Sequence, residues 1–329
     1  MNEVVTSIKP VTRAIRYYAA GGTGINLLRS HREAVVLTRE MSVAEEHFSF
    51  IDTSFANLHN AERSETFTLK GVDGSGSDRK KNYEAITAAL PEIMLAHEPS
   101  DMNVVIFSSS GGTGSVAGPI ILEELLQRGK SVLAIVIGSH TTVKRTTNTI
   151  GTLTGLEVVA EELGRPIVMF YYENDLDKSD ADNNIRPSFV LGSLGTLCSG
   201  MNKSMDSSDI ANALDYNNVT HHAPGLAMLN VVTKAEEVTE PVISYLALLK
   251  DEEQVPPRFT ADYDKTGYMP DSTKTQNNFY YTVSTEPLSV LFDGLKKKRD
   301  TIATQKQIHK TTTKLATADT KRAGRLVFD

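Results

Sequence analysis

Apolar and polar residues follow one another along the first half of the chain in blocks that predict alternating strands and helices. Short apolar runs predict strands at 15–19, 48–51, 104–107, 132–137 and 167–172, and longer periodic segments predict helices at 81–97, 116–126 and 150–163. The run 132–137 is entirely aliphatic, which is typical of a strand buried on both faces. Strands that alternate with helices predict an α/β fold built on a parallel sheet.

The second half of the chain predicts a helix followed by a second α/β region. Apolar residues at spacings of three and four predict a helix over 185–201. The polar, proline-containing segment 251–278 is expected to be mostly loop. The other expected elements are a helix at 210–214, a strand at 227–232, a helix at 239–249, a strand at 279–284 and a long amphipathic helix at 289–317.

A glycine-rich segment, Ser108-Ser-Ser-Gly-Gly-Thr-Gly-Ser115, follows the predicted strand 104–107 and precedes a predicted helix. Such a turn exposes backbone N–H groups at the positive end of a helix dipole, which is an arrangement that binds phosphate. No lysine follows the glycines, so the segment is not a P-loop. The segment Gly22-Thr-Gly-Ile-Asn-Leu27 matches a dinucleotide fingerprint only in part, because Leu27 replaces the third glycine.

Several such segments come at the ends of predicted strands. Glycine loops at 21–24, 74–76 and 111–115, together with Asn174, are expected at one rim of the sheet. Ligands of open parallel sheets bind beyond the carboxyl ends of the strands. The sequence therefore predicts a nucleotide site at this rim.

Composition and charge narrow the class of protein. The 329 residues include one cysteine, so an intrachain disulfide is excluded, and a reducing cytoplasm is expected. Neither a run of about 20 apolar residues nor a secretory signal is visible, so no membrane partner is expected. The formal net charge is −7, yet 295–325 carries ten Lys or Arg and two Asp. A basic segment of this kind can bind nucleic acid or an acidic protein surface.

Within this layout, Gly111-Gly-Thr-Gly-Ser115 resembles the signature loop of the tubulin/FtsZ superfamily, with Ser110 where the commonest form has another glycine. The chain is most similar to the phage-encoded tubulin-like proteins of the PhuZ group. The resemblance implies a Rossmann-like GTPase domain at 1–183 and a long central helix at 184–203. It also implies a smaller α/β domain at 204–288 and a C-terminal helix and tail at 289–329.

The resemblance further implies GTP or GDP as ligand, with Mg²⁺ held largely by the nucleotide and no dedicated metal cage in the protein. Asn174 and Asn184 would read the guanine, with Asn183 as an alternative to Asn184, since an amide both donates and accepts hydrogen bonds. Loop 74–77 would lie at the γ-phosphate. The other nucleotide contacts would come from Gly21, Gly22, Thr23, Gly24, Asn26, Gly74, Ser75, Gly76, Gly111, Gly112, Thr113, Gly114 and Ser115.

The segment Asp206-Ser-Ser-Asp209 resembles the loop whose two acids, in this superfamily, enter the nucleotide pocket of the neighbouring subunit. Ser204 stands where the usual motif has Asn. As catalytic residues, both carboxylates would orient the attacking water. Asp209 could equally be the N-cap of the helix at 210–214. A head-to-tail contact that does not close into a ring produces a filament, so the chain itself is the expected partner.

Other partners and functions stay open. The terminal segment 325–329 is expected to contact the next subunit, and an adaptor or the phage DNA compartment in the host cytoplasm could also be bound. The family role would be to position phage DNA. One alternative is a nicotinamide-dependent oxidoreductase that uses Gly22-Thr-Gly24. Another is a DNA-binding partition module that acts through 296–325.

Overall fold

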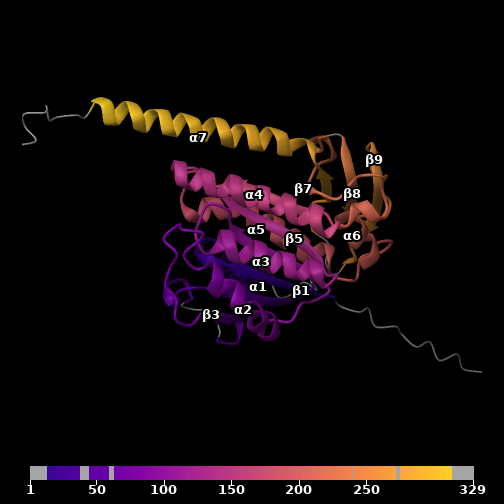
Figure 1. Ribbon diagram of the computed structural model, residues 1–329. Coiled ribbons are helices and arrows are strands. Elements are labelled where there is room, and N and C mark those ends of the chain that lie inside the picture. The colour runs from indigo at the N-terminus through magenta and orange to yellow at the C-terminus, as the bar shows by residue number, and fades with distance from the viewer. Residues whose placement is uncertain (1–12, 38–43, 59–62, 240, 272–274, 313–329) are drawn as a thin grey trace, which may run out of the picture.

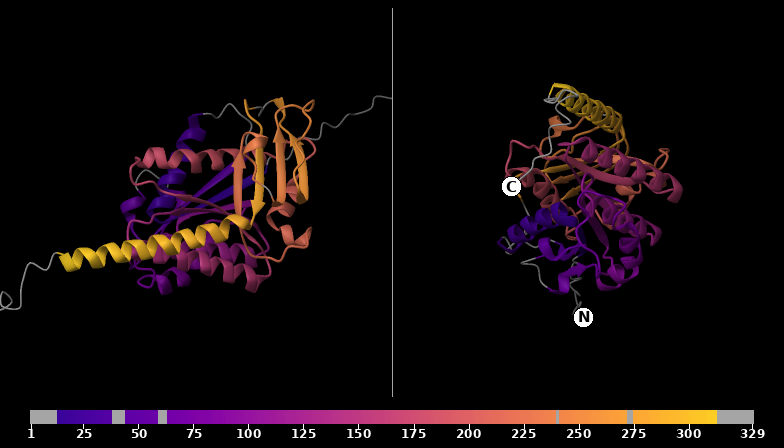
Figure 2. Two further views of the ribbon diagram at one scale, coloured as in Figure 1. Left: turned by 90° about the horizontal axis from the view of Figure 1, so that it is seen from above. Right: turned by 60° about the vertical axis from the view of Figure 1, so that its left-hand side comes forward.

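A central sheet with helices on both of its faces forms the body of the protein (Figure 1, Figure 2). The computed structural model describes residues 13–37, 44–58, 63–239, 241–271 and 275–312. The long helix α7 (Glu286–Thr312) runs across the body and extends past its edge. The described strands form one ten-stranded sheet in the order β3-β2-β1-β4-β5-β6-β7-β10-β8-β9.

The bounds of the elements are as follows. The strands are β1 (Ala14–Ala20), β2 (Glu45–Asp52), β3 (Thr66–Thr68), β4 (Met102–Ser108), β5 (Ser131–Gly138), β6 (Ile167–Glu173), β7 (Leu226–Val232), β8 (Val242–Leu249), β9 (Ala261–Tyr268) and β10 (Phe279–Ser284). The helices before α7 are α1 (Gly21–Leu37), α2 (Tyr83–Ala96), α3 (Gly114–Gln127), α4 (Val143–Leu163), α5 (Asp180–Leu197) and α6 (Ser207–Leu214). A short 3₁₀ turn, η1 (Phe55–Asn57), follows β2.

The order of the strands creates a switch point in the sheet. The strands from β3 to β7 in this order are all parallel, and β10 is antiparallel to both β7 and β8. The chain moves outward from β1 to β2 and β3, and then returns to β4 on the other side of β1. Open α/β sheets bind ligands at such a point, beyond the carboxyl ends of the strands.

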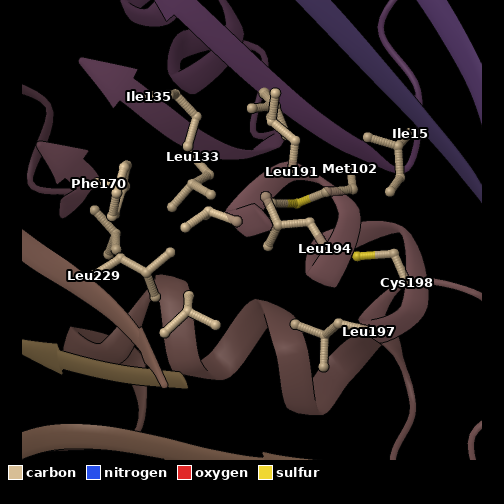
Figure 3. Close-up of a cluster of buried hydrophobic side chains, with 14 of the residues drawn as sticks. Ile15, Met102, Leu133, Ile135, Phe170, Leu191, Leu194, Leu197, Cys198 and Leu229 are labelled. Atoms are coloured by element: carbon tan, nitrogen blue, oxygen red, sulfur yellow. The ribbon is translucent and has the colours of Figure 1, made fainter. Parts of the chain in front are cut away.

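Two layers of buried side chains cover the sheet. Successive residues of β1 point to opposite faces, so Tyr17 joins the core under α1, α5 and α6, whereas Tyr18 joins the core under α2, α3, α4 and α7. Both tyrosines are fully buried. Figure 3 shows part of the first layer, in which sheet residues meet α5; it includes Met102, Leu133, Phe170, Leu191, Leu194 and Leu197.

The expected α/β fold with a parallel sheet is confirmed, but the helix expected at 239–249 is wrong. Residues 242–249 form strand β8, which lies between β10 and β9 and is buried at every position. An apolar run buried on both faces has no periodicity that separates strand from helix. The segment 251–278 is also more than loop, because it contains the edge strand β9.

Several helices begin earlier than the apolar pattern indicates, and three of them have a polar, capped first turn. Helix α5 begins at Asp180 rather than 185, α4 at Val143 rather than 150, and α6 at Ser207 rather than 210. Their first turns are polar and capped: Ser179 and Thr142, for example, accept backbone N–H groups of α5 and α4. Helix α1 was not expected, and the end of the helix expected at 289–317 lies outside the described residues. None of the described helices is both long and apolar enough to cross a membrane.

Candidate active site

Three glycine loops, which follow β1, β3 and β4, meet at the carboxyl edge of the sheet. Together they line a cavity of about 310 Å³, which we call the phosphate cavity. Its lining includes 21–23, 74–76 and 111–114, each of which follows a different strand. The remaining lining residues are Ala20, Asp52, Ser54, Ala56, Asn57 and Ser108. Helix α3 begins at Gly114, so the positive end of its dipole points at the cavity.

Glycine is required where these loops touch. A Cβ on Gly21 would lie 2.8 Å from the N of Gly114, and Gly21 has φ +72°. A Cβ on Gly112 would lie 2.4 Å from the Cβ of Ser75. The backbones of the glycine loops therefore come close to one another, and main-chain atoms line this part of the cavity.

A chain of buried hydroxyl groups ties the loops 74–76 and 111–115 to each other and to the end of β2. The Oγ1 of Thr113 lies 2.9 Å from the Oγ1 of Thr53 and 3.1 Å from the Oγ of Ser75. The Nδ2 of Asn82 donates to the Oγ of Ser75 (3.1 Å). From below, the Oγ of Ser115 donates to the carbonyl of Gly111 (2.7 Å). The shape of the cavity is thus set before any ligand binds.

Asp52 supplies the carboxylate of the cavity lining. It is buried, and it accepts hydrogen bonds from the N–H of Thr53 and from the Nδ2 of Asn57, both at 2.7 Å. Arg29 links this group to the rim, because it donates to the carbonyl of Asn57 (2.7 Å) and to the Oδ1 of Asn26 (3.3 Å). Among the described residues, no cluster of three or more His, Cys, Asp or Glu could hold a metal ion. Asp52 is the carboxylate that this lining offers to a cation.

Two predicted nucleotide contacts, Asn26 and Asn184, approach each other between α1 and α5. The Nδ2 of Asn184 donates to the Oγ of Ser30 (3.4 Å), which in turn donates to the carbonyl of Asn26 (3.1 Å). Asn26 itself is exposed and does not line the phosphate cavity. The alternative, Asn183, is buried and bonded to its own loop, including the N–H of Asp175 (2.8 Å). Asn184 therefore has the freer side chain of the two.

The third candidate, Asn174, lies at a separate cavity of about 420 Å³ at the end of β6. Its lining includes His140, Glu173 and Lys298 of helix α7. The Nδ1 of His140 lies 2.6 Å from Glu173, and Lys298 pairs with the same carboxylate. Burial alone would raise the pKa of Glu173, but its hydrogen bonds and charge interactions with His140 and Lys298 lower that pKa to about 2.

The two acids of the predicted catalytic loop cap helix α6. The Oδ1 of Asp206 accepts the N–H groups of Ser208 (2.7 Å) and Asp209 (3.2 Å), and the Oδ2 of Asp209 accepts the N–H of Asp206 (2.9 Å). The N-cap is therefore Asp206, with Asp209 completing a capping box. The hydrogen bonds from the two backbone N–H groups lower the pKa of Asp206, so it is ionised at neutral pH. Lys265 lies 3.3 Å from Asp209.

This acidic loop lies at the opposite edge of the sheet from the phosphate cavity. A cavity of about 500 Å³ adjoins it, and its lining joins 207–208 to Arg13, Met102 and Ser131, at the amino ends of β1, β4 and β5. Met102 begins β4 and Ser108, which lines the phosphate cavity, ends it. Six residue steps along β4 span about 20 Å. One copy of the chain therefore cannot bring its own acids to its own phosphate cavity.

Comparisons with known proteins agree with this architecture. Residues 15–168 match the model of the Tubulin/FtsZ family, GTPase domain. The phage tubulin-like protein of Pseudomonas phage 201phi2-1 is 30% identical over 255 residues, which cover 76% of this chain and 78% of that protein. The chain belongs to the tubulin/FtsZ family. This tubulin/FtsZ protein is accordingly a GTPase, which replaces the oxidoreductase alternative.

Solved structures share the fold of this family member. The structure described as a protofilament of TubZ from bacteriophage PhiKZ has a TM-score of 0.81 at 25% identity, and the match covers 89% of this chain and 92% of that one. The phage tubulin PhuZ–GDP structure has a TM-score of 0.83 at 23% identity, with 94% and 97% covered. The family match ends at residue 168, and the domain boundaries at 183, 203 and 288 stay predictions.

Some residues of this site were not singled out from the sequence. Asp52 and Thr53 end a predicted strand, and a polar residue at that place is a usable signal. Asn57 lies in the short turn η1, and nothing in its neighbours distinguishes it. Asn148, whose Nδ2 donates to the carbonyls of Ser77 and Ser110 behind the cavity lining, lies in the part of α4 that the apolar pattern missed.

Proposed function

We propose that this chain is a cytoskeletal GTPase that assembles head to tail into filaments. In the assembly, GTP in the phosphate cavity of one copy would be hydrolysed with the help of Asp206 and Asp209 of the next copy. The observation that carries this proposal is the placement of the cavity and the acids at opposite edges of one sheet, about 20 Å apart along β4. Stacking two copies along the strand direction joins the two halves. Such a heterologous contact repeats indefinitely as a filament.

Nucleotide binding follows from the geometry of the cavity. The glycine loops and the N-terminus of α3 would bind the phosphates of GTP or GDP through backbone N–H groups. Asn184 and Asn26 would contact the guanine between α5 and α1, and Asn174 would contact it from the loop that leads into α5. A bound Mg²⁺ would neutralise phosphate charge, and it would be held chiefly by the nucleotide, with Asp52 as its protein neighbour.

Hydrolysis needs a positioned water, which an isolated subunit does not supply. Asp206 is ionised at neutral pH because backbone N–H groups stabilise its charged form. The capping box also fixes Asp206 relative to Asp209, so that both carboxylates reach the neighbouring copy as one rigid unit. Carboxylates at that place would orient and polarise the attacking water. GTP turnover would therefore depend on assembly.

Because the relatives are phage proteins, we propose that the filament forms in the cytoplasm of an infected bacterium. There we propose that it positions phage DNA. The terminal segment 325–329, which lies outside the described residues, is proposed to contact the next subunit along the filament. A DNA compartment or an adaptor is proposed as a further partner of the basic segment 295–325.

A mixing experiment tests the shared site. Asp209→Asn keeps the phosphate cavity but loses an acid, whereas Gly112→Val keeps both acids but fills the cavity next to Ser75. Each variant alone should turn over GTP slowly. The mixture should recover turnover, because some contacts pair an intact cavity with intact acids. Cosedimentation of labelled copies checks that the two variants assemble together.

Two results would contradict the proposal. Full turnover by Asp209→Asn alone would exclude a role for this acid. A mixture that cosediments but stays as inactive as its components would show that the active site is not shared between copies.

Assembly itself has a separate measurement. Light scattering of the wild-type chain should rise with GTP.

A further inference from the structure

Beneath the phosphate cavity, one side chain joins two of its loops. Asn148, on α4, donates from Nδ2 to the carbonyls of Ser77 (3.2 Å) and Ser110 (3.1 Å), and the carbonyl of Gly111 lies 3.5 Å away. An amide nitrogen carries two hydrogens, so it can satisfy one carbonyl in each loop at the same time. The loops follow β3 and β4, which are separated in the sheet by β2 and β1. A single amide thus couples loops from strands that do not touch.

Loop 74–77 depends on such a support. Gly76 and Ser77 both have a left-handed backbone, with φ of +56° and +59°. Left-handed serine is uncommon, so the surroundings must hold this conformation in place. The positions where Cβ atoms of Gly74 and Gly76 would lie are open space. Ser75 anchors the near end of the loop through Thr113, and Asn148 anchors the far end.

The chain that follows the loop also rests on α4. The side chain of Arg79 crosses α4 at Gly151. The NH1 of Arg79 would lie 2.8 Å from a Cβ added to Gly151. Its guanidinium is half-buried and has no hydrogen-bonding partner among the described residues, and burial lowers its pKa. The segment from Ser77 to Arg79 therefore contacts α4, and Asn148 supplies the hydrogen bond of this contact.

The position of the loop indicates which part of a nucleotide it meets. The candidate base contacts Asn26 and Asn184 lie on α1 and α5, which cover one face of the sheet. Loop 74–77 rests on α4, and α2, α3 and α4 cover the other face. A nucleotide with its base between α1 and α5 extends its phosphates across the switch point and away from the base. The last phosphate is then the one closest to loop 74–77.

We propose that Asn148 is a positioning residue that makes the cavity selective for nucleoside triphosphate over diphosphate. The inference rests on the proposed function for the orientation of the nucleotide. Asn148 is not part of the cavity lining, so it acts through the two carbonyls that it fixes. With loop 74–77 held, the N–H of Ser77 stays beside Gly112, where a third phosphate meets it. Without this support, the terminal phosphate loses its contact while the first two phosphates keep theirs.

Two substitutions test the proposal in the full chain, below the concentration at which it assembles. Asn148→Asp keeps the shape but turns a donor into a carboxylate that faces carbonyl oxygens, and Asn148→Ala removes the group. Dissociation constants for GTP and GDP come from competition with a fluorescent guanine nucleotide. The preference for GTP over GDP should fall about tenfold, as expected for the loss of one to two hydrogen bonds. Affinity for GDP should stay within about threefold.

Thr146→Val is the matched control. Thr146 is buried on the same helix, but its Oγ1 donates to the carbonyl of Thr142 (3.0 Å) in the turn before it, rather than to either loop. Its GTP preference should equal that of the wild type. An unchanged preference in folded Asn148→Ala, or equal losses for GTP and GDP, would overturn the inference. A wild-type chain that binds neither nucleotide would instead contradict the proposed function.

Turnover under assembly conditions provides a second readout. If Asn148 acts on the terminal phosphate, Asn148→Ala should raise the KM for GTP while the kcat of assembled protein stays near wild type. A fall in kcat with KM unchanged would contradict a positioning role in binding. A general loss of structure would lower both the melting temperature and the amount of assembled protein. We do not expect Asn148→Ala to lower the two together.

Discussion

The hydroxyl groups of Thr53 and Thr113 lie 2.9 Å apart in the buried wall of the phosphate cavity, although 60 positions separate them in the sequence. Thr113 uses the same oxygen to reach Ser75 at 3.1 Å. This residue therefore connects the loops after β2, β3 and β4. The three loops form one hydrogen-bonded unit. The loss of stability on substitution should therefore grow with the number of these hydrogen bonds that are removed.

Thr113→Val should destabilise the protein by about 2 kcal/mol, because it leaves two buried hydroxyls without this partner. Thr53→Val removes one of the two bonds of Thr113, together with a long 3.4 Å contact between Thr53 and Asp52 that contributes little, and should cost about 1 kcal/mol. Urea denaturation measures both values. Thr87→Val is the control, since Thr87 is exposed and bonds only the carbonyl of Tyr83 in its own helix. Equal effects of Thr53→Val and Thr113→Val would contradict the shared role of Thr113.

Gly112→Ala should weaken binding of GTP and GDP at least about tenfold, since its Cβ would lie 2.4 Å from the Cβ of Ser75. Gly155→Ala is the control. Gly155 is exposed on α4, its Cβ would meet nothing within 4 Å, and the change should stabilise the helix by about 0.5–1 kcal/mol. Isothermal titration calorimetry and thermal melting separate the two effects. Unimpaired nucleotide binding by Gly112→Ala would mean that the phosphates do not occupy this cavity.

The ion pair between Glu173 and Lys298 should make the docking of α7 dependent on pH. The pKa of Glu173 is lowered from its ordinary value of 4.5 to about 2. A lowered carboxyl pKa contributes stability above the unfolded-state value, and this contribution is lost as pH falls from about 4.5 to 2. The difference in urea midpoint between wild type and Glu173→Gln should be full at pH 5–7 and shrink below pH 4.5.

The same substitution should loosen α7 at neutral pH. Limited proteolysis within 296–299 should be faster in Glu173→Gln than in the wild type, because Lys298 loses its anionic partner. Lys296→Gln serves as the control, since Lys296 is exposed and lies 3.9 Å from Asp293 of its own helix. Cleavage of Glu173→Gln at the wild-type rate would show that other contacts alone hold α7 to the nucleotide domain.

Arg165→Lys should destabilise the protein by about 2 kcal/mol, since lysine cannot reproduce a bidentate contact. The NH2 of Arg165 lies 2.8 and 2.7 Å from the two carboxylate oxygens of Asp215, and its NH1 donates to the carbonyl of Leu126 (2.8 Å). The exposed pair Arg128–Glu124 offers a matched comparison, and Arg128→Lys should cost less than about 0.5 kcal/mol. Similar denaturation midpoints for both variants would contradict this prediction.

Cys198 should be unreactive in the folded protein. It is buried, and that burial raises the pKa of its thiol to about 12, so the reactive thiolate is absent at neutral pH. Iodoacetamide at pH 8 should label it only after unfolding, as mass spectrometry of the intact chain would show. Rapid labelling of native protein would contradict the burial of this thiol in the core.

The apolar pattern was sufficient to predict the parallel sheet and the rim that carries the glycine loops. Runs such as 104–107 and 132–137 are buried on both faces, and a loop after each parallel strand must emerge at the same edge. The pattern failed at 242–249, where a strand buried between two others is as uniformly apolar as a buried helix. It also missed the start of α4, because its first turn is polar and is held by the cap at Thr142.

By itself the sequence determined which segments could bind phosphate, because glycines and a following helix are local features. It also indicated Asp209 as a candidate N-cap, whereas the structure places the cap at Asp206. Only the tertiary structure placed Asp206 and Asp209 at the far edge from the phosphate cavity, and only it placed Asn148 under two loops. Both facts depend on the order of strands in the sheet and on the packing of α4 against it. Distances between segments remote in sequence are set by packing, and local patterns carry no information about them.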